Sequence, residues 1–537
     1  MSHAFSLLIG NIVLTGFMGT GKTSVGRQVA RRTGRAFVDM DTEIEARAGK
    51  SLPRIFAEDG EGMFRRMEAA LCEELSAQQG LVIATGGGAL VDPINRARMR
   101  SGTIVCLTCD VDEIMQRVSE DNSDRPLLNV GHPRAEIERL LELRREAYRA
   151  IPWQIDTTDL SVEEVAVRVV GIAGVITLLV RYPGGQYPIH SGDGLLVHIG
   201  GMLGAAGVPE GSRIAVVSNP VVSPLYGAQV EAALRSAGFQ PCACSIPDGE
   251  LHKTPATIAA LYDQFLANEL DRSGTVLSLG GGVTGDLAGF AAATFMRGLR
   301  FVQVPTTLLA MVDASVGAKT GVDLPQGKNL VGAFKQPALV VVDPAVLATL
   351  PAEEIHSGMA EVIKHGIIGA PDLFAELERR GEGKGTRSQG DWVVWIAHSL
   401  RVKIAIVEQD PFEQGRRAAL NLGHTVGHAL ERLSGFSLRH GEAVSIGMVA
   451  AARIAVELGQ AGLLLAPRIE AALAAWGLPV RCPPFDANAI WKAMAHDKKR
   501  RGRSLRWVLP HALGDVEITE GVPQETVMSV LRDLGAR

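Results

Sequence analysis

The chain has 537 residues, too many for one hydrophobic core, so we expect two to four domains. Hydrophobic residues make up 46% of it and charged residues 21%, a balance typical of soluble globular proteins. The net charge of -5 argues against a general nucleic-acid or membrane-surface binder, so any phosphate must be bound locally by a few placed cations and backbone groups.

The apolar N-terminus runs directly into a glycine loop. It has no Lys or Arg ahead of the apolar residues and no cleavage-like stretch, so we interpret it as a buried first strand rather than a signal peptide. No apolar run approaches the ~20 residues that a membrane helix needs. Six cysteines without a CxxC pair argue against a zinc or disulfide framework and fit a reducing compartment. We therefore expect a cytoplasmic protein that binds neither nucleic acid nor a membrane.

Residues 11–34 have the pattern of a strand, a glycine loop and a helix, and they contain G-x-x-x-x-G-K-[ST] from Gly16 to Thr23. In such a loop the backbone N–H groups surround phosphate oxygens, Lys22 reaches the β- and γ-phosphates, and Thr23 binds Mg²⁺. The sequence therefore predicts a nucleotide triphosphate site. Its cofactor-binding residues are expected to be Gly19, Gly21, Lys22, Thr23 and Ser24.

Carboxylates and arginines for a phosphate acceptor follow along the chain. Strand alternation in "AFVDMDTEIE" puts Asp39 and Asp41 on the same side of a strand end, where one suits Mg²⁺ and the other a substrate hydroxyl. A helix-capping pair is the alternative. Further on, "MFRRME", "TGGG", "SDRPLL" and "LELRREAY" supply backbone contacts and cations, namely Arg65, Gly87, Arg125 and Arg144.

With this ordered set of motifs, residues 8–172 resemble the shikimate kinases. The resemblance implies a three-layer P-loop kinase fold of the NMP-kinase type, with ATP and Mg²⁺ as cofactors. It implies Mg²⁺ on Thr23 and Asp39, ATP beside Arg125 in the lid, and catalytic roles for Asp41 and Lys22. Shikimate would be held by Asp41, Arg65, Gly87 and Arg144. The lid departs from the family pattern at Val118, where Thr is common.

A helix pattern over residues 161–174 closes this first part, and a strand pattern follows without a linker, so we place a domain boundary near residue 174. From residue 175 to about 345 apolar strands alternate with helices, which predicts a parallel α/β sheet. Its turn in "SLGGGVTGD" suits a pyrophosphate, although it is not GxGxxG. From residue 346 to 537 the pattern is mainly helical.

The helical part holds an unusual group of histidines. His424 and His428 lie four residues apart, and on one helix they would share a polar stripe with Arg417, Asn421 and Glu431. The HExxH chemistry of metalloproteases is excluded, because Thr425 follows His424 where that motif has Glu.

Further donors come from "GMAEVIKHG", with Glu361 and His365, and from "LRHGEAV", with His440. Two neutral imidazoles and one carboxylate make a familiar zinc site with an open position. The spacing alone leaves open which of the four histidines bind a metal, and for a lone histidine a structural role is the more common one.

Taken with "PDGELHK", "GGGVTGDLAGF", "GKNLVGAF" and "HDKK", these motifs make residues 177–535 resemble the 3-dehydroquinate synthases. The resemblance implies a Rossmann-like NAD-binding α/β domain followed by a helical metal- and substrate-binding domain. It implies Zn²⁺ or Co²⁺ on Glu361, His424 and His440. NAD would contact Asp248, Glu250, Lys253, Gly282, Val283, Thr284, Gly285, Asp286, Thr306, Thr307, Lys319, Lys328 and Thr349.

The same resemblance implies the residues around the substrate. Catalytic roles would fall to Lys319, Lys364, Arg417 and His428. Arg297 would reach the substrate phosphate of a partner subunit, which implies a homodimer. The other substrate-binding residues would be Asp313, Asn329, Asn421 and Lys498.

The whole chain is thus expected to be a bifunctional enzyme of aromatic amino acid biosynthesis. It would phosphorylate shikimate and convert 3-deoxy-D-arabino-heptulosonate 7-phosphate to 3-dehydroquinate and phosphate. One alternative is a metal-dependent polyol dehydrogenase, which would not need as many phosphate-directed cations as Lys319, Lys328 and Arg417 provide. Another makes the N-terminal part a regulatory ATP-binding module, against which the intact Lys22 and Asp41 argue.

Overall fold

The computed structural model describes residues 10–120, 132–382, 389–413, 415–501 and 505–537. Packing divides the chain into two compact units. The first runs to Ile176 and also takes in residues 192–212 and 229–240, whereas the second comprises residues 177–191, 213–228 and 241–537. The domain boundaries that we placed near residues 174 and 345 stay predictions.

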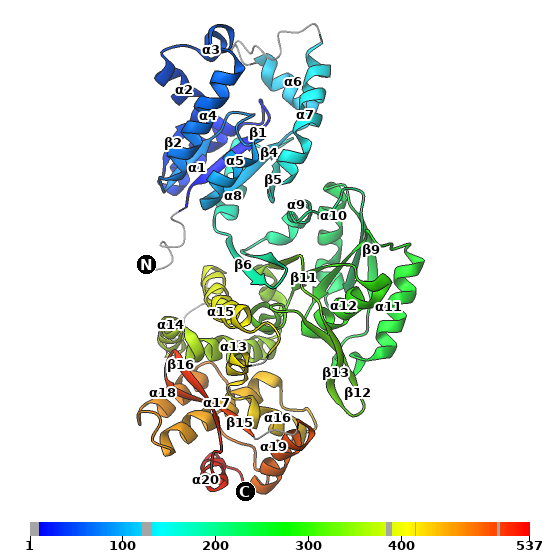
Figure 1. Ribbon diagram of the computed structural model, residues 1–537, viewed down its shortest axis with the longest axis vertical. Coiled ribbons are helices and arrows are strands. Elements are labelled where there is room, and N and C mark those ends of the chain that lie inside the picture. Colours follow the sequence, from blue (N-terminus) through cyan, green and yellow to red (C-terminus); the bar gives the residue numbers. More distant parts are fainter. Residues whose placement is uncertain (1–9, 121–131, 383–388, 414, 502–504) are drawn as a thin grey trace. The chain divides into compact units, whose positions relative to one another are not determined.

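The first unit is built on a parallel sheet with the strand order β2-β3-β1-β4-β5 (Figure 1). Strands β1 and β4 are apolar runs that are almost wholly buried, as strands covered on both faces require. Because β1 lies between β3 and β4, the loops that follow β1 and β3 meet at one edge of the sheet. The strands are β1 (Ile12–Gly16), β2 (Ala36–Asp39), β3 (Leu81–Ala84), β4 (Thr103–Thr108) and β5 (Trp153–Asp156).

Amphipathic helices bury their apolar faces against this sheet. The core joins Val13 and Ile83 of the strands to Leu71 and Ile137 of the helices. The three-layer α/β architecture expected for this unit is confirmed. The helices are α1 (Lys22–Thr33), α2 (Met40–Ala48), α3 (Leu52–Glu58), α4 (Glu61–Ser76), α5 (Pro93–Arg98), α6 (Val111–Glu120), α7 (Pro133–Arg149) and α8 (Val162–Ala173).

One local prediction in this unit is wrong. Strand β2 ends at Asp39, and Asp41 lies in the first turn of α2 instead of on the same strand. Asp39 is the N-cap of α2, because its carboxylate accepts hydrogen bonds from the backbone N–H groups of Asp41 and Thr42. The helix-capping alternative therefore describes Asp39, and strand alternation fails because the chain turns into a helix between the two carboxylates.

A second, larger sheet has the order β6-β7-β14-β11-β10-β8-β9, and its central pairs are parallel. Strand β10 is buried along its whole length and leads directly into α12, as the predicted nucleotide-binding turn requires. An antiparallel hairpin, β12–β13, follows η8. The bounds are β6 (Ile176–Tyr182), β7 (Gly185–Ser191), β8 (Arg213–Ser218), β9 (Gln240–Ser245), β10 (Thr275–Gly280), β11 (Arg300–Pro305), β12 (Lys319–Leu324), β13 (Gly327–Phe334) and β14 (Leu339–Val342).

Helices α11 and α12 accompany this sheet, and further helices then form the mainly helical part, which ends with a short hairpin and a last helix (Figure 1). Helix α9 and all but the first residue of α10 belong to the first unit. The expected parallel α/β sheet and mainly helical part are both present. The bounds are α9 (Ile199–Ala205), α10 (Ala228–Ser236), α11 (Pro255–Ala267), α12 (Gly282–Thr294), η8 (Ala310–Ala314), α13 (Ala352–Gly369), α14 (Pro371–Glu382), α15 (Gln389–Gln409), η10 (Arg416–Asn421), α16 (His424–Leu433), α17 (His440–Glu457), α18 (Leu465–Ala475), α19 (Ala487–Arg501), β15 (Arg506–Ala512), β16 (Asp515–Glu520) and α20 (Gln524–Asp533).

The predicted polar stripe around the two histidines is interrupted. Arg417 and Asn421 belong to η10, and α16 begins only at His424. Gly423 separates the two elements with a φ of 81°, a left-handed conformation that L side chains disfavour. The continuous helix that the spacing predicted is therefore two elements, and only His424, His428 and Glu431 share one helix face.

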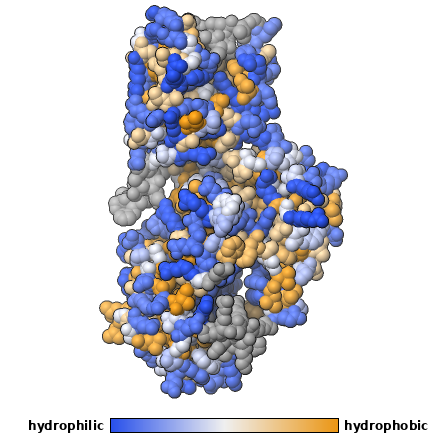
Figure 2. Space-filling model, in the orientation of Figure 1, coloured by the Kyte–Doolittle hydropathy of each residue, from blue (hydrophilic) through white to orange (hydrophobic). Residues whose placement is uncertain are grey.

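Polar and hydrophobic residues are interspersed over the face drawn in Figure 2. Within the described ranges, no helix is both long and apolar enough to cross a bilayer. All six cysteines lie in the described part of the chain, and each carries a free thiol.

Candidate active sites

The glycine loop of the first unit lines a pocket of about 800 Å³. It connects β1 to α1, and the backbone at Gly19 and Gly21 has φ values of 79° and 87°, which glycine adopts without strain. Gly21 is the N-cap of α1 and offers no side-chain acceptor, so the first N–H groups of this helix are available to an anion. Gly19, Gly21, Lys22, Thr23 and Ser24 all line the pocket.

Two polar contacts order the phosphate end of this pocket. The Thr23 hydroxyl donates to Asp39 Oδ2 over 2.7 Å, which brings together the two oxygens expected to serve Mg²⁺. Lys22 Nζ donates a hydrogen bond to the backbone oxygen of Phe17 over 2.8 Å, so the Lys22 ammonium contacts the backbone at the start of the glycine loop. Arg125, expected in the lid, lies outside the described residues.

At the other end of the pocket, carboxylates and guanidinium groups surround the glycine segment after β3. Arg144 and the Tyr148 hydroxyl both donate to the Gly87 oxygen, over 3.2 and 2.8 Å. Arg65 and Asp41 line the same space. The expected acceptor-binding residues therefore meet in one pocket, although they come from α2, α4, α7 and the loop after β3.

Glu68 is a pocket residue that the sequence analysis missed. Its side chain is 1% exposed and one of its oxygens forms an ion pair with Arg65 at 2.5 Å, whereas Oε1 has no hydrogen-bond partner among the described residues. Burial raises the pKa of the Glu68 carboxyl, although Arg65 opposes the rise. The signal lay in "FRRME", where Glu68 follows Arg65 by three residues on one helix face.

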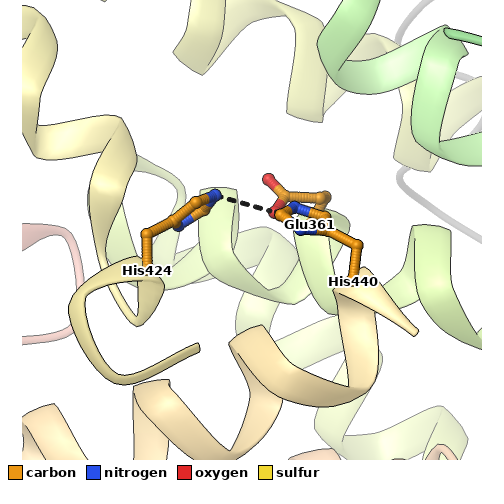
Figure 3. A group of neighbouring side chains, drawn as sticks. All are labelled: Glu361, His424 and His440. Carbon is orange, nitrogen blue, oxygen red and sulfur yellow. Dashed lines mark ion pairs between the residues drawn. The ribbon is translucent and has the colours of Figure 1, made fainter. Parts of the chain in front are cut away.

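In the second unit, Glu361, His424 and His440 point toward one another from three helices (Figure 3). One ligand atom from each lies within 4.8 Å of the others. Glu361 Oε1 is 3.9 Å from His424 Nε2 and 3.7 Å from His440 Nε2, too far for hydrogen bonds. Two ligands that each lie ~2.0–2.1 Å from a tetrahedral metal are roughly 3.4 Å apart, so this spacing fits a metal between them.

The charge states of Glu361 and His424 also suit a cation. At His440, against the effect of burial, the carboxylates of Glu361 and Glu431 raise the pKa to about 10, so a metal would displace a proton from that ring. Burial alone would raise the pKa of the Glu361 carboxyl, but the Lys364 ammonium and the two imidazoles hold it well below its usual range. Glu361 is fully buried and forms an ion pair with Lys364. Burial lowers the pKa of His424 well below its usual value, and this keeps its ring in the neutral form that binds metals.

Close packing of α16 on α17 sets the distance between these two histidines. A Cβ on Gly447 would lie 1.9 Å from the Gly423 oxygen, and one on Gly423 would lie 2.6 Å from the Val444 oxygen. The backbones can therefore touch only because both positions are glycine. Because the two helices pack this closely, His424 at the start of α16 and His440 at the start of α17 both lie within 4 Å of the Glu361 carboxylate.

The other two histidines are placed differently. His428 is exposed, and its ring centroid lies 5.1 Å from that of His424. It therefore lies beside the candidate metal site of Glu361, His424 and His440, called the metal group below. His365 is fully buried, with Nδ1 2.5 Å from the Ser399 hydroxyl. Burial lowers the pKa of His365 to about 3, so this ring is neutral. It forms another close group of metal-ligand atoms with Asp313 and Glu361.

The cations expected around the substrate have acceptors within the second unit, and most of these acceptors are carboxylates. Lys319 forms an ion pair with Glu413, and Lys403 forms one with Asp313 at 2.6 Å. Arg417 is buried and donates to the Pro411 oxygen over 2.9 Å. Lys403 and Glu413 were missed by the sequence analysis. A lysine in the apolar stretch "VKIAIV" was the available signal for Lys403, whereas no local signal marks Glu413.

The expected cofactor residues surround the start of α12. The buried Lys253 forms an ion pair with Asp286 at 2.5 Å and donates to Asn329 Oδ1 over 2.6 Å. Lys328 pairs with Glu250 at 3.1 Å. Gly281 caps α12 without a side-chain acceptor, so the N–H groups from Gly282 onward can face a pyrophosphate. Val283, Thr284 and Gly285 complete this first turn.

Contacts link this turn to the metal group. A Cβ on Gly282 would lie 3.4 Å from Ala314, which ends the same short helix η8 that carries Asp313. The first turn of α12 thus packs beside η8, and a carboxylate oxygen of Asp313 on η8 lies within 4.8 Å of one of Glu361. Thr306 and Thr307 follow β11, where Thr306 N–H donates to the Gly280 oxygen and Thr307 Oγ1 accepts from Ala310 N–H.

The remaining predicted residues are placed as follows. Asp248 accepts a hydrogen bond from Asn219, and Thr349 contacts the Tyr226 hydroxyl at 2.5 Å; the sequence analysis missed Asn219 and Tyr226. Asn421 ends η10 and is exposed, and Arg297 is exposed after α12. Lys498 belongs to α19, but its side chain lies outside the described part.

Comparisons with known proteins assign both units. A family model described as shikimate kinase matches residues 18–172. Models for the N-terminal and C-terminal parts of 3-dehydroquinate synthase match residues 243–357 and 358–500.

Relatives with curated names agree with these models. A 3-dehydroquinate synthase of Synechococcus sp. is 46% identical over 361 residues, which cover 66% of this chain and 98% of that protein. The 3-dehydroquinate synthase of Geobacter metallireducens is 46% identical over 343 residues, covering 64% and 95%. Among solved structures, a 2-epi-5-epi-valiolone synthase from Streptomyces hygroscopicus with NAD⁺ and Zn²⁺ bound is 28% identical, with a TM-score of 0.58 and coverage of 65% and 96%.

Proposed function

The chain belongs to the 3-dehydroquinate synthase family through its C-terminal two thirds and carries a shikimate kinase domain ahead of it, and on this premise we propose which residues perform the two reactions. It is a bifunctional enzyme of the shikimate pathway. One reaction transfers a phosphoryl group from ATP to shikimate. The other converts 3-deoxy-D-arabino-heptulosonate 7-phosphate to 3-dehydroquinate and phosphate.

For the kinase reaction, we assign phosphate binding to the glycine loop and Lys22. Thr23 and Asp39 would hold Mg²⁺, since their oxygens already lie 2.7 Å apart. Arg65 and Arg144 suit the carboxylate of shikimate, because guanidinium groups bind carboxylates with two parallel hydrogen bonds. Asp41 lies in the same pocket and would orient the attacking hydroxyl, while Lys22 neutralises charge on the transferred group.

For the synthase reaction, the observation with most weight is the convergence of Glu361, His424 and His440 on one point. These residues would hold Zn²⁺ or Co²⁺, and NAD would lie at the first turn of α12. The bound metal would supply Lewis-acid chemistry at a substrate hydroxyl, and NAD would accept and return a hydride. Support comes from the structural relative that binds NAD⁺ and Zn²⁺.

The protein's own side chains would bind and orient the substrate, which carries a phosphate and a carboxylate. Lys319 and Arg417 would pair with these two groups, and Lys364 forms an ion pair with the proposed ligand Glu361. Such fixed positioning lowers the barrier, because the reacting groups need no further ordering. His428 lies beside His424 and would hold or pass a proton at the substrate. Asp313, which is paired with Lys403, and Asn329, which accepts a hydrogen bond from Lys253, would also contact the substrate.

Two variants separate the reactions in one chain. Protein stripped of metal is assayed for phosphate release from the heptulosonate phosphate with and without Zn²⁺, while NADH absorbance and shikimate-dependent ADP formation are followed. We expect metal-dependent phosphate release without NADH build-up. His424→Ala should abolish phosphate release and leave ADP formation intact, and Lys22→Met should do the reverse.

Other outcomes would contradict the assignment. NADH that accumulates without phosphate release would indicate a polyol dehydrogenase. ATP binding without shikimate phosphorylation would indicate a regulatory module in the first unit. A full synthase rate in His424→Ala would remove this residue from the metal site.

We also propose a cytoplasmic homodimer that uses the synthase part. The six free thiols suit a reducing compartment. Arg297 is exposed on a turn with a φ of 69°, a placement that suits a reach into a neighbouring subunit. Light scattering should give twice the chain mass of 57.1 kDa. Arg297→Ala should lower phosphate release without dissociating the dimer; a monomeric active enzyme would refute the proposal.

A further inference from the structure

His440 lies between two carboxylates. Its Nε2 faces Glu361 Oε1 at 3.7 Å, within the group that would hold the metal. Its Nδ1, on the opposite side of the ring, is 3.3 Å from Glu431 Oε1, within hydrogen-bond distance. Glu431 belongs to α16 and is largely buried, with 12% of its side chain exposed. Among the described residues, His440 is the only hydrogen-bond partner of this carboxylate.

The same arrangement recurs at the other histidine of the group. His424 turns Nε2 toward Glu361 and places Nδ1 3.1 Å from the Leu422 oxygen. A backbone oxygen can only accept, so Nδ1 of His424 carries the hydrogen and Nε2 is left with its lone pair. Both rings therefore aim Nε2 at one carboxylate while an oxygen acceptor faces Nδ1. A backbone carbonyl serves His424, and the Glu431 side chain serves His440.

We propose that Glu431 is a positioning residue that fixes the tautomer and orientation of His440 for metal binding. A carboxylate that accepts Nδ1–H keeps the hydrogen off Nε2, holds the ring plane and makes the ring a better electron donor. Such an outer carboxylate typically changes metal affinity by about 10–100-fold. The inference rests on the metal site proposed above.

Glu431 has one competing role. Its carboxylate also forms a close group with His428 and His440, so it could bind a second ion directly. In that case the wild-type synthase part would bind two ions per chain, whereas a positioning role predicts one. The stoichiometry therefore separates a ligand from a residue that acts through His440.

The experiment is a Co²⁺ titration of metal-stripped full-length protein, read from the visible d–d absorption and from competition with a chelator. We expect one ion per chain in the wild type. Glu431→Ala should weaken the affinity about 10–100-fold and alter the d–d band, with one ion still bound at saturation. Glu431→Gln should fall between the two, because its amide oxygen still accepts from Nδ1 but carries no charge.

A matched control removes a nearby charge without touching the ring. Glu442 lies two residues after His440, and its carboxylate accepts from the Arg439 N–H at the start of α17. Glu442→Gln keeps that cap, since Gln also serves at this position, and should leave cobalt affinity unchanged. Circular dichroism and urea unfolding of each full-length variant report whether the second unit, which holds Glu431, is folded, and Glu431→Gln decides the question if the alanine variant is not.

The outcomes distinguish this inference from the metal site itself. If His424→Ala loses the metal while both Glu431 variants keep wild-type affinity and spectrum, the positioning role is overturned and the site stands. Two ions in the wild type and one in Glu431→Ala would also overturn it, in favour of a ligand. If His424→Ala binds Co²⁺ as the wild type does, the proposed metal site fails first.

Discussion

The contact between α16 and α17 gives a sharp test of how the metal site is built. In Gly447→Ala the new Cβ would lie 1.9 Å from the Gly423 oxygen and 2.7 Å from its carbonyl carbon, whereas ordinary contacts begin at 3.4 Å. Backbone atoms cannot rotate away, so the helices must separate locally by about 1.5 Å. Overpacking of this kind typically costs ~1–3 kcal/mol of folding free energy.

The effect on the metal should exceed the effect on stability. Metal–ligand distances tolerate only ~0.2 Å, so moving His424 away from Glu361 by several times that amount should abolish tight binding. We expect Gly447→Ala to lose most bound Zn²⁺ and phosphate release while shikimate phosphorylation persists. The assays are metal content per chain after dialysis, both activities, and urea unfolding.

Gly462→Ala is the matched control, because a Cβ there meets nothing within 4 Å. It should keep wild-type metal content and both activities. If Gly447→Ala also retained one tightly bound Zn²⁺ per chain and full phosphate release, the helix contact would not set the ligand geometry, and our account of the site would be wrong.

Three further predictions concern buried charged or titratable groups. Burial lowers the pKa of His190 to about 4, below its usual 6.5, so between pH 7 and 5 the unfolded chain protonates this ring while the folded chain does not. The free energy of unfolding should therefore fall by about 2 kcal/mol over this range. Urea unfolding of metal-stripped protein should show a smaller decrease for His190→Gln. Lys364→Met leaves the Glu361 charge buried without its ion pair and should cost ~3–5 kcal/mol, whereas adding Glu361→Gln to it should recover much of that loss in the same unfolding assay. Glu68→Gln should raise the KM for shikimate more than it lowers kcat, because Arg65 loses the charge that holds it, and an unchanged KM would exclude this role.

Features that depend on local chain geometry could be predicted from sequence. The glycine loop before α1 needs glycine at left-handed positions and a helix start after them, and both requirements are visible in a few adjacent residues. The turn between β10 and α12 could be predicted for the same reason, because its glycines and the helix start are adjacent in the sequence. Periodicity failed where a short break intervened, as at Gly423, whose left-handed backbone ends η10 before α16 can begin.

Residues whose roles depend on distant partners could not be found in this way. The partner of His365 is one example, because its Nδ1 faces the hydroxyl of Ser399, 34 residues along the chain. Glu413 carries no motif and is identified only by its ion pair with Lys319, 94 residues away. Spacing fixes which residues share a helix face, but it cannot say which helices meet.

The residue types of the proposed metal site could be recognised in the sequence, but their geometry could not. The three proposed ligands begin or lie within α13, α16 and α17, so the distances between them follow from helix packing. Glycines 423 and 447 let two backbones touch, and this contact brings the two imidazoles to one carboxylate. The ion pair with Lys364 keeps the Glu361 carboxylate ionised without any contribution from a metal. In the proposed site the ligand types would therefore set the class of metal ion, whereas the residues between the helices would set whether the ligands come close enough to bind one.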